Sequence, residues 1–201
     1  MLFSSIEFLY YFLPCVVAVY FLLPKAVRNG WLLVSSLVFY AWGEPKYVAL
    51  MIASILLFYG CGLAIGKARQ QSWKKFWLTV SVAVSLTLLG IFKYADFFID
   101  SFNAVTGLSV PLLRLALPIG ISFYTFQIVS YIIDVYRGDV SAQKNFINLA
   151  TYISMFPQLI AGPIVRYSDV DSQLENRKHS LSLIAKGIRR FIIGLSKKVL
   201  F

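Results

Sequence analysis

Polar side chains capable of acid–base chemistry lie inside one of the most apolar stretches of the chain, residues 117–138 (LPIGISFYTFQIVSYIIDVYRG). On a helix, Gln127, Tyr131 and Asp134 recur at spacings of three and four and therefore share one face. An ionisable group within a membrane span is costly and usually faces a bundle interior or a wet cavity. The spacing predicts a polar stripe that lines a passage. The alternative is that Asp134, near the helix end, pairs with Arg137 and only anchors that end.

Other residues suited to catalysis are sparse. The single histidine, His179, lies in a polar string at 175–180, which is typical of a solvated loop. Cys15 and Cys61 lie in apolar runs without a CxxC or Cys/His spacing, so we expect them to pack rather than to bind metal or form a disulfide. The sequence shows no nucleophile motif, phosphate-binding glycine loop or paired carboxylates, and no convincing catalytic constellation emerges from it alone.

The elements that must position the polar stripe are predicted to be membrane helices. Of the 201 residues, 59% are hydrophobic and 14% are charged, which leaves little polar surface for water. Several uncharged runs approach the ~17–25 residues that a helix needs to cross hydrocarbon. The pattern predicts an all-α, multi-pass helical bundle in the lipid bilayer with about five spans. The apolar segments lie near 8–23, 31–42, 47–66, 76–92 and 118–135.

Basic residues orient these segments. The loops after the first and third segments carry cations and no acid, and such loops stay in the cytoplasm. The N-terminus is therefore expected outside. Because residues 1–24 lack a basic start and a small-residue cleavage site, we expect a retained helix rather than a signal peptide. The cations of the two loops are Lys25, Arg28, Lys67, Arg69, Lys74 and Lys75.

A sixth apolar segment, residues 146–163, is unlike a continuous span. Pro157, Gly162 and Pro163 interrupt it, much as Pro118 interrupts the start of the preceding segment. Broken backbone at membrane depth is tolerated only where protein or water satisfies the freed polar groups. We expect a re-entrant or cavity-lining segment that leaves the following tail in the cytoplasm.

The tail predicts an amphipathic basic helix over residues 181–200. Two placements remain open: the headgroup plane, with the cations near anionic lipid, or the cytoplasmic face of the protein itself. The net charge of +10 does not indicate nucleic acid, because the cations follow helix ends as membrane topology demands. The cations of this helix are Lys186, Arg189, Arg190, Lys197 and Lys198.

Two motifs, LPIGISFYTFQIVSYIIDVYRG and FPQLIAGPIVRY (156–167), resemble the membrane-bound O-acyltransferase (MBOAT) family. More narrowly, they are similar to the branch that contains the membrane subunit of bacterial alginate O-acetyltransferase. The similarity runs from MLFSSIEFLYYFLP through VFYAWGEPKY and GIFKYADFFIDSFN to GLSKKVLF, and so covers essentially the whole chain.

The same resemblance indicates what this chain lacks. Family members are longer, and their essential histidine lies in a later Trp-His-Gly context that is not found here. His179 does not match that context, so we expect the family histidine beyond Phe201. The chain is accordingly expected to be the N-terminal half of a family member, inactive as a fragment.

The resemblance implies a helical bundle in the bacterial inner membrane whose tunnel joins a cytoplasmic acyl donor, such as acetyl-CoA, to an outer acceptor. The implied function is O-acetylation of an exported, alginate-like polysaccharide, directly or through a periplasmic acetyltransferase partner, with no bound cofactor or metal. Gln127, Tyr131 and Asp134 would shape the tunnel, and Arg166 would lie near the donor. D-alanyl transfer to teichoic acid is one alternative, and a non-catalytic scaffold or transporter-like bundle is another. The glycan, the transferred group, the donor and the oligomeric state stay open.

Overall fold

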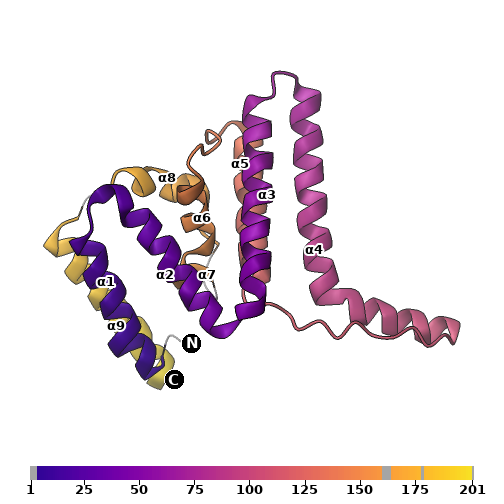
Figure 1. Ribbon diagram of the computed structural model, residues 1–201, viewed down its shortest axis with the longest axis horizontal. Coiled ribbons are helices and arrows are strands. Elements are labelled where there is room, and N and C mark those ends of the chain that lie inside the picture. Colours follow the sequence, from indigo (N-terminus) through magenta and orange to yellow (C-terminus); the bar gives the residue numbers. More distant parts are fainter. Residues whose placement is uncertain (1–3, 160–163, 178, 201) are drawn as a thin grey trace.

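The computed structural model of the protein describes residues 4–159, 164–177 and 179–200, and all regular structure in these ranges is helical (Figure 1). In chain order the elements are η1 (Glu7–Phe12), α1 (Leu13–Leu22), η2 (Lys25–Val27), α2 (Arg28–Gly43), η3 (Pro45–Tyr47), α3 (Val48–Lys67), α4 (Gln71–Thr106), α5 (Ile121–Arg137), α6 (Phe146–Ser154), α7 (Phe156–Leu159), α8 (Tyr167–Glu175) and α9 (Leu181–Leu200).

Three residues named in the sequence predictions lie outside the described residues. Gly162 and Pro163 are two of the predicted breaks, and Phe201 is the position beyond which the family histidine is expected. The predictions attached to these three positions therefore stay predictions.

The main core lies where α3, α4 and α5 pack along one another and α6 and α8 close against them. Met51 and Ile55 of α3 and Ile128 and Ile132 of α5 are fully buried there. These helices expose apolar side chains on their outer faces, as lipid-facing helices do, so only one stripe of each is sequestered. The core therefore forms around α5, which contacts all four of its neighbours.

A second, aromatic core joins the N-terminal helices to α7. The Phe8 ring lies 5.7 Å from that of Phe39 in α2 and 6.0 Å from that of Phe156 in α7, edge to face in both cases. Phe12 also meets Phe156 edge to face at 5.4 Å. Such pairs stabilise by about 0.5–1.5 kcal/mol each beyond the area they bury. This cluster fixes α7 against α2, and α2 also packs on α6.

Two helical segments are long and apolar enough to cross a membrane by length and composition, Pro45–Lys67 and Gln71–Thr106. Glu7–Leu22 forms a shorter apolar helix, and α2 and α5 have 16 and 17 residues. The lengths alone thus do not establish the five predicted crossings. In the segment at 146–163, helix breaks off at Met155, and Pro157 lies in the short helix that follows.

Helix α4 continues well past the predicted end near residue 92 and reaches Thr106. Figure 1 shows that it bends, so that its last part turns away from the direction of its first part. The Asp96 carboxylate accepts hydrogen bonds from the backbone N–H groups of Leu113 and Arg114 at 2.8 and 3.0 Å, which ties the returning chain to this arm. Charged residues interrupt the apolar run here, so the sequence pattern did not reveal that the helix goes on.

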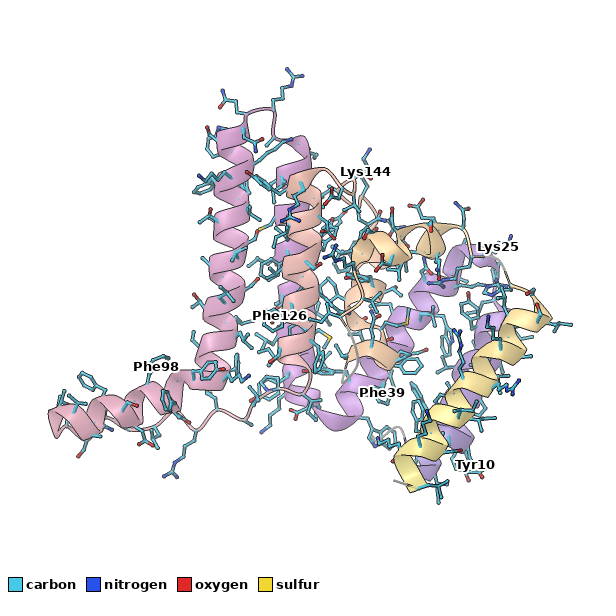
Figure 2. The ribbon with its side chains drawn as sticks, turned by 180° about the vertical axis from the view of Figure 1, so that it is seen from behind. Tyr10, Lys25, Phe39, Phe98, Phe126 and Lys144 are labelled. Atoms are coloured by element: carbon cyan, nitrogen blue, oxygen red, sulfur yellow. The ribbon has the colours of Figure 1, made fainter. Side chains whose placement is uncertain are left out.

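The cationic loops gather at one end of the molecule. The α1–α2, α3–α4 and α5–α6 connections all lie towards the top in Figure 1, and Figure 2 labels Lys25 and Lys144 at that end. The α2–α3 turn and the arm of α4 lie at the opposite end, where Figure 2 labels Phe98. We refer to these as the cationic end and the opposite end.

Helix α9 packs only loosely on the rest of the described chain, and its placement in the headgroup plane stays a prediction. No side chain described in it is buried, so it does not pack closely on the protein's own face. Figure 1 shows α9 following the direction of α1 and ending near the N-terminus, rather than lying across the ends of the other helices. Leu183, Ile188 and Ile192 leave more than half of their side-chain surface exposed.

Candidate functional site

Helix α5 buries the whole predicted polar stripe. Gln127 is 1% exposed, Tyr131 0% and Asp134 6%. The helix begins after Gly120, whose φ of +77° is one that L side chains rarely adopt. A Cβ built on Gly120 would lie only 2.6 Å from the carbonyl oxygen of Leu159. The start of α5 is therefore held against α7, and the Pro118 carbonyl accepts from the Ile121 N–H in the same turn.

Unpaired oxygens concentrate on α5. Among the described residues, several buried side-chain oxygens have no hydrogen-bond partner, and α5 carries most of them. A buried polar atom without a partner costs about 1–3 kcal/mol, so packing alone does not account for these residue types. The α5 atoms are Tyr124 Oη, Thr125 Oγ1, Gln127 Oε1 and Asp134 Oδ2.

The alternative explanation for Asp134 is not seen. Its Oδ2 is buried without a partner, and Arg137 is exposed and forms no ion pair with it within the part of the chain that the structure describes. Of the neighbouring cations, Arg166 acts most strongly on the Asp134 carboxyl, while Asp139 and Asp169 oppose it. Arg166 itself is exposed at the N-cap of α8. Asp134 is thus a buried acid without an ion-pair partner among the described residues.

Tyr131 packs tightly against α3. A Cβ built on Gly62 would lie 3.0 Å from both Cε1 and Oη of the Tyr131 side chain, a tight contact, so this glycine lets the ring pack closely on α3. The Tyr131 hydroxyl accepts a hydrogen bond from the backbone N–H of Gln143 at 2.9 Å. The α5–α6 connection is thereby fixed to the middle of the bundle at the cationic end.

Gln143 extends this link to α8. Its Nε2 donates to the Tyr167 hydroxyl at 2.7 Å, and its Oε1 accepts from the Asn145 N–H at 2.9 Å. Burial, and secondarily the nearby carboxylate of Asp171, raise the pKa of the Tyr167 phenol above its ordinary value, so this hydroxyl stays protonated and neutral. Gln143 and Tyr167 thus form a buried hydrogen bond between two neutral side chains.

Three tyrosine rings form the wall beside this network. Tyr167 meets Tyr131 at 5.0 Å and Tyr152 at 5.2 Å between ring centroids, in edge-to-face geometry. The Tyr152 hydroxyl donates to the carbonyl of Val165 at 2.7 Å. Sequence reasoning identified Tyr131 but not Gln143, Tyr152 or Tyr167. Their partners lie 12 or more residues away, and the only available signal was the place of Tyr167 beside Arg166 in the FPQLIAGPIVRY motif.

The remaining candidates lie apart from this network. His179 is exposed, yet its ring contacts Tyr20 and Phe21, so it is more than the solvated loop residue that was predicted. Cys15 and Cys61 are free, the first exposed and the second buried. A search of the described residues finds no group of three or more metal-ligating side chains.

Comparison with known proteins now identifies the class. The sequence profile of the membrane-bound O-acyltransferase family (MBOAT) matches residues 38–201. The chain therefore belongs to this family, and the predicted resemblance is confirmed. No solved structure matches the chain.

Named relatives are bacterial. The chain is 46% identical to "Probable alginate O-acetylase AlgI" of Azotobacter vinelandii and 44% identical to the protein of that name from Pseudomonas aeruginosa; 99% of the chain is covered in each case, against 41% and 39% of those relatives. It is also 33% identical to "Peptidoglycan O-acetyltransferase" of Helicobacter pylori, covering 44% of that protein. The chain thus spans well under half the length of the curated relatives it matches. The family histidine expected beyond Phe201 stays a prediction.

Proposed function

We propose that this chain is part of a bacterial inner-membrane enzyme that O-acetylates an exported polysaccharide. Membership of the O-acyltransferase family and the names of the alginate and peptidoglycan relatives support transfer of an acetyl ester to a glycan hydroxyl. The observation that carries the proposal is the set of buried, unpaired polar atoms on α5, where most such atoms of the described residues lie. Such groups are retained in membrane proteins where a substrate pathway needs them.

The proposed topology has the N-terminus outside and five crossings, made by α1, α2, α3, the first part of α4, and α5. The gathering of the cationic loops at one end supports a cytoplasmic placement of that end. The arm of α4 would then lie in the outer interface, and α6 and α7 would not cross. Single cysteines at Arg69 and Phe98 test this: an impermeant thiol reagent added to intact cells should label only the second.

The polar face of α5 would border the route by which an acetyl group, supplied by a cytoplasmic donor such as acetyl-CoA, meets its acceptor. A sugar hydroxyl is a poor nucleophile and needs a general base and a stabilised oxyanion. The contribution proposed for Gln127, Tyr131 and Asp134 is to orient the reactants by hydrogen bonding and to exclude bulk water, which would otherwise compete as acceptor. Arg166 would attract the anionic donor at the cationic end.

The test compares exported glycans from cells with and without the gene that encodes this chain. Ester-linked groups are released with mild base and identified by mass spectrometry. Loss of acetate, restored by the gene, is the expected result, and the glycan fraction that loses it names the acceptor. Loss of D-alanine instead, or no change in any ester, would refute the proposal.

A further inference from the structure

A cluster of cations surrounds one tyrosine away from the α5 stripe. The guanidinium carbons of Arg28 and Arg177 lie 5.1 and 5.9 Å from the centroid of the Tyr20 ring. The Tyr20 hydroxyl accepts from Arg177 Nη1 at 3.4 Å and lies 3.0 Å from Nε2 of His179. Three segments far apart in the sequence, namely α1, the start of α2 and the stretch after α8, thus converge on a single ring.

Nothing within the described ranges neutralises this cluster directly. Neither arginine has a carboxylate within 4.0 Å; Arg28 instead donates from Nε to the Leu23 carbonyl at 3.0 Å. One acid, Glu175, lines the cleft beside Tyr20 together with Lys25, Arg28 and Arg177, which leaves cations in excess there. Both guanidinium groups approach the same ring and line the same cleft, so an anion bound there would offset their like charge.

The cluster lies at the rim of an apolar cavity. The cavity has a volume of about 420 Å³, which falls in the range of small-molecule sites. Arg177 and His179 line it together with Tyr20, while the rest of the wall comes chiefly from apolar side chains of α1, α2 and the α6–α8 region, among them Val17 and Leu32. A ligand that fits both the cation cluster and the apolar cavity has an anionic head and an apolar tail.

The position of the cation cluster favours a membrane lipid among such ligands. The cluster lies next to the α1–α2 turn, and Lys25 of that turn is labelled at the cationic end in Figure 2. This is the depth at which headgroups of the cytoplasmic leaflet lie in the proposed topology, where anionic lipids attract basic residues. Val17 and Phe21, both more than 40% exposed, give the cavity an apolar flank towards the surrounding lipid.

We infer that this site binds an anionic phospholipid, with its phosphate between Arg28 and Arg177 and an acyl chain in the cavity. This goes beyond the proposed transfer reaction, because the lipid is a bound structural ligand and not a reactant. A phosphorylated soluble acyl donor shares the same head chemistry, so the experiment must separate the two sources.

Native mass spectrometry of the protein from its complete gene, purified in detergent and mixed with equal phosphatidylglycerol and phosphatidylcholine, tests the inference. The wild type should retain phosphatidylglycerol preferentially, and R28Q/R177Q should lower its occupancy by at least about tenfold, since two charge-assisted contacts are lost. The matched control K67Q/R69Q removes the same charge at the same end, outside the cavity lining, and should retain it. Equal loss in the control, or no preference in the wild type, would overturn the inference.

Two further experiments separate loss of the lipid site from poor folding and from binding of a soluble ligand. Val17→Trp fills the cavity without changing charge, and it should also reduce phosphatidylglycerol retention even if the double variant folds poorly; full retention would contradict the assigned cavity. Coenzyme A, added in excess, should leave the lipid bound. Displacement of phosphatidylglycerol by coenzyme A would assign the cluster to a soluble phosphorylated ligand and overturn the lipid assignment.

Discussion

The interior around α5 differs from the periphery at α9 and the arm of α4. Water-soluble proteins bury apolar side chains and expose polar ones, and here the two regions show the opposite. Gln127 and Asp134 are buried inside the bundle, whereas Phe98 in the arm and Leu183 in α9 are more than half exposed. In lipid, apolar side chains lose nothing by facing outwards, and helices associate through close packing and polar contacts. The informative residues are therefore the buried polar ones and the glycines that let helices approach.

The largest expected effect on stability within the α5 region comes from the glycine at the start of α5. Gly120→Ala adds a Cβ that would lie 2.6 Å from the Leu159 carbonyl oxygen, on a backbone of φ +77°. We expect a loss of at least about 3 kcal/mol of unfolding free energy, from backbone strain plus overpacking. Thermal or denaturant unfolding in detergent measures it.

Gly138→Ala is the matched control for that substitution. Gly138 has a similar φ of +83°, but a Cβ there would meet nothing within 4 Å. Only the backbone cost of about 1–2 kcal/mol is expected. Equal losses in the two variants would contradict the account of close packing between α5 and α7.

A smaller loss is expected from the buried network beside α5. Tyr167→Phe removes the hydroxyl that accepts from Gln143 Nε2 and leaves that donor buried, which should cost about 1–3 kcal/mol. Because the raised pKa keeps this phenol neutral, the loss should not vary between pH 6 and 9.

Tyr136→Phe separates burial from hydrogen bonding. Its hydroxyl also accepts from a glutamine, Gln71 Nε2 at 3.0 Å, but in an exposed position where water can replace it. We expect Tyr136→Phe to lower the unfolding free energy by less than about 0.5 kcal/mol. A loss as large as that of Tyr167→Phe would show that burial does not make the hydrogen bond near α5 more important for stability.

The smallest effect is expected in the arm of α4. Phe98 is 66% exposed, so Phe98→Ala should change the unfolding free energy in detergent by no more than about 0.5 kcal/mol. Phe156→Ala, in the aromatic core, should instead cost about 3–5 kcal/mol. A large loss from the Phe98 variant would indicate that the arm packs against something other than lipid or detergent.

Local periodicity was enough to indicate the α5 stripe, because spacings of three and four on a helix fix one face regardless of what packs there. The family, too, could be recognised from short motifs. The sequence did not reveal Gln143 or Tyr167, since their hydrogen bonds depend on how α5, α6 and α8 meet. It also missed the continuation of α4, because Asp96 in the arm binds backbone N–H groups of the returning chain rather than facing water alone.

The central claim is that the unpaired polar atoms on α5, Gln127 Oε1 above all, serve acetyl transfer and not folding. The direct measurement is ester-bound acetate on exported glycan in cells that carry the wild type, Gln127→Leu or Phe126→Leu in the complete gene, at matched membrane abundance. Gln127→Leu removes a buried oxygen that has no partner, so abundance should hold while acetate falls at least about tenfold. Phe126→Leu, on the exposed side of α5, should leave acetate unchanged. Normal acetate in the Gln127→Leu cells would contradict the account.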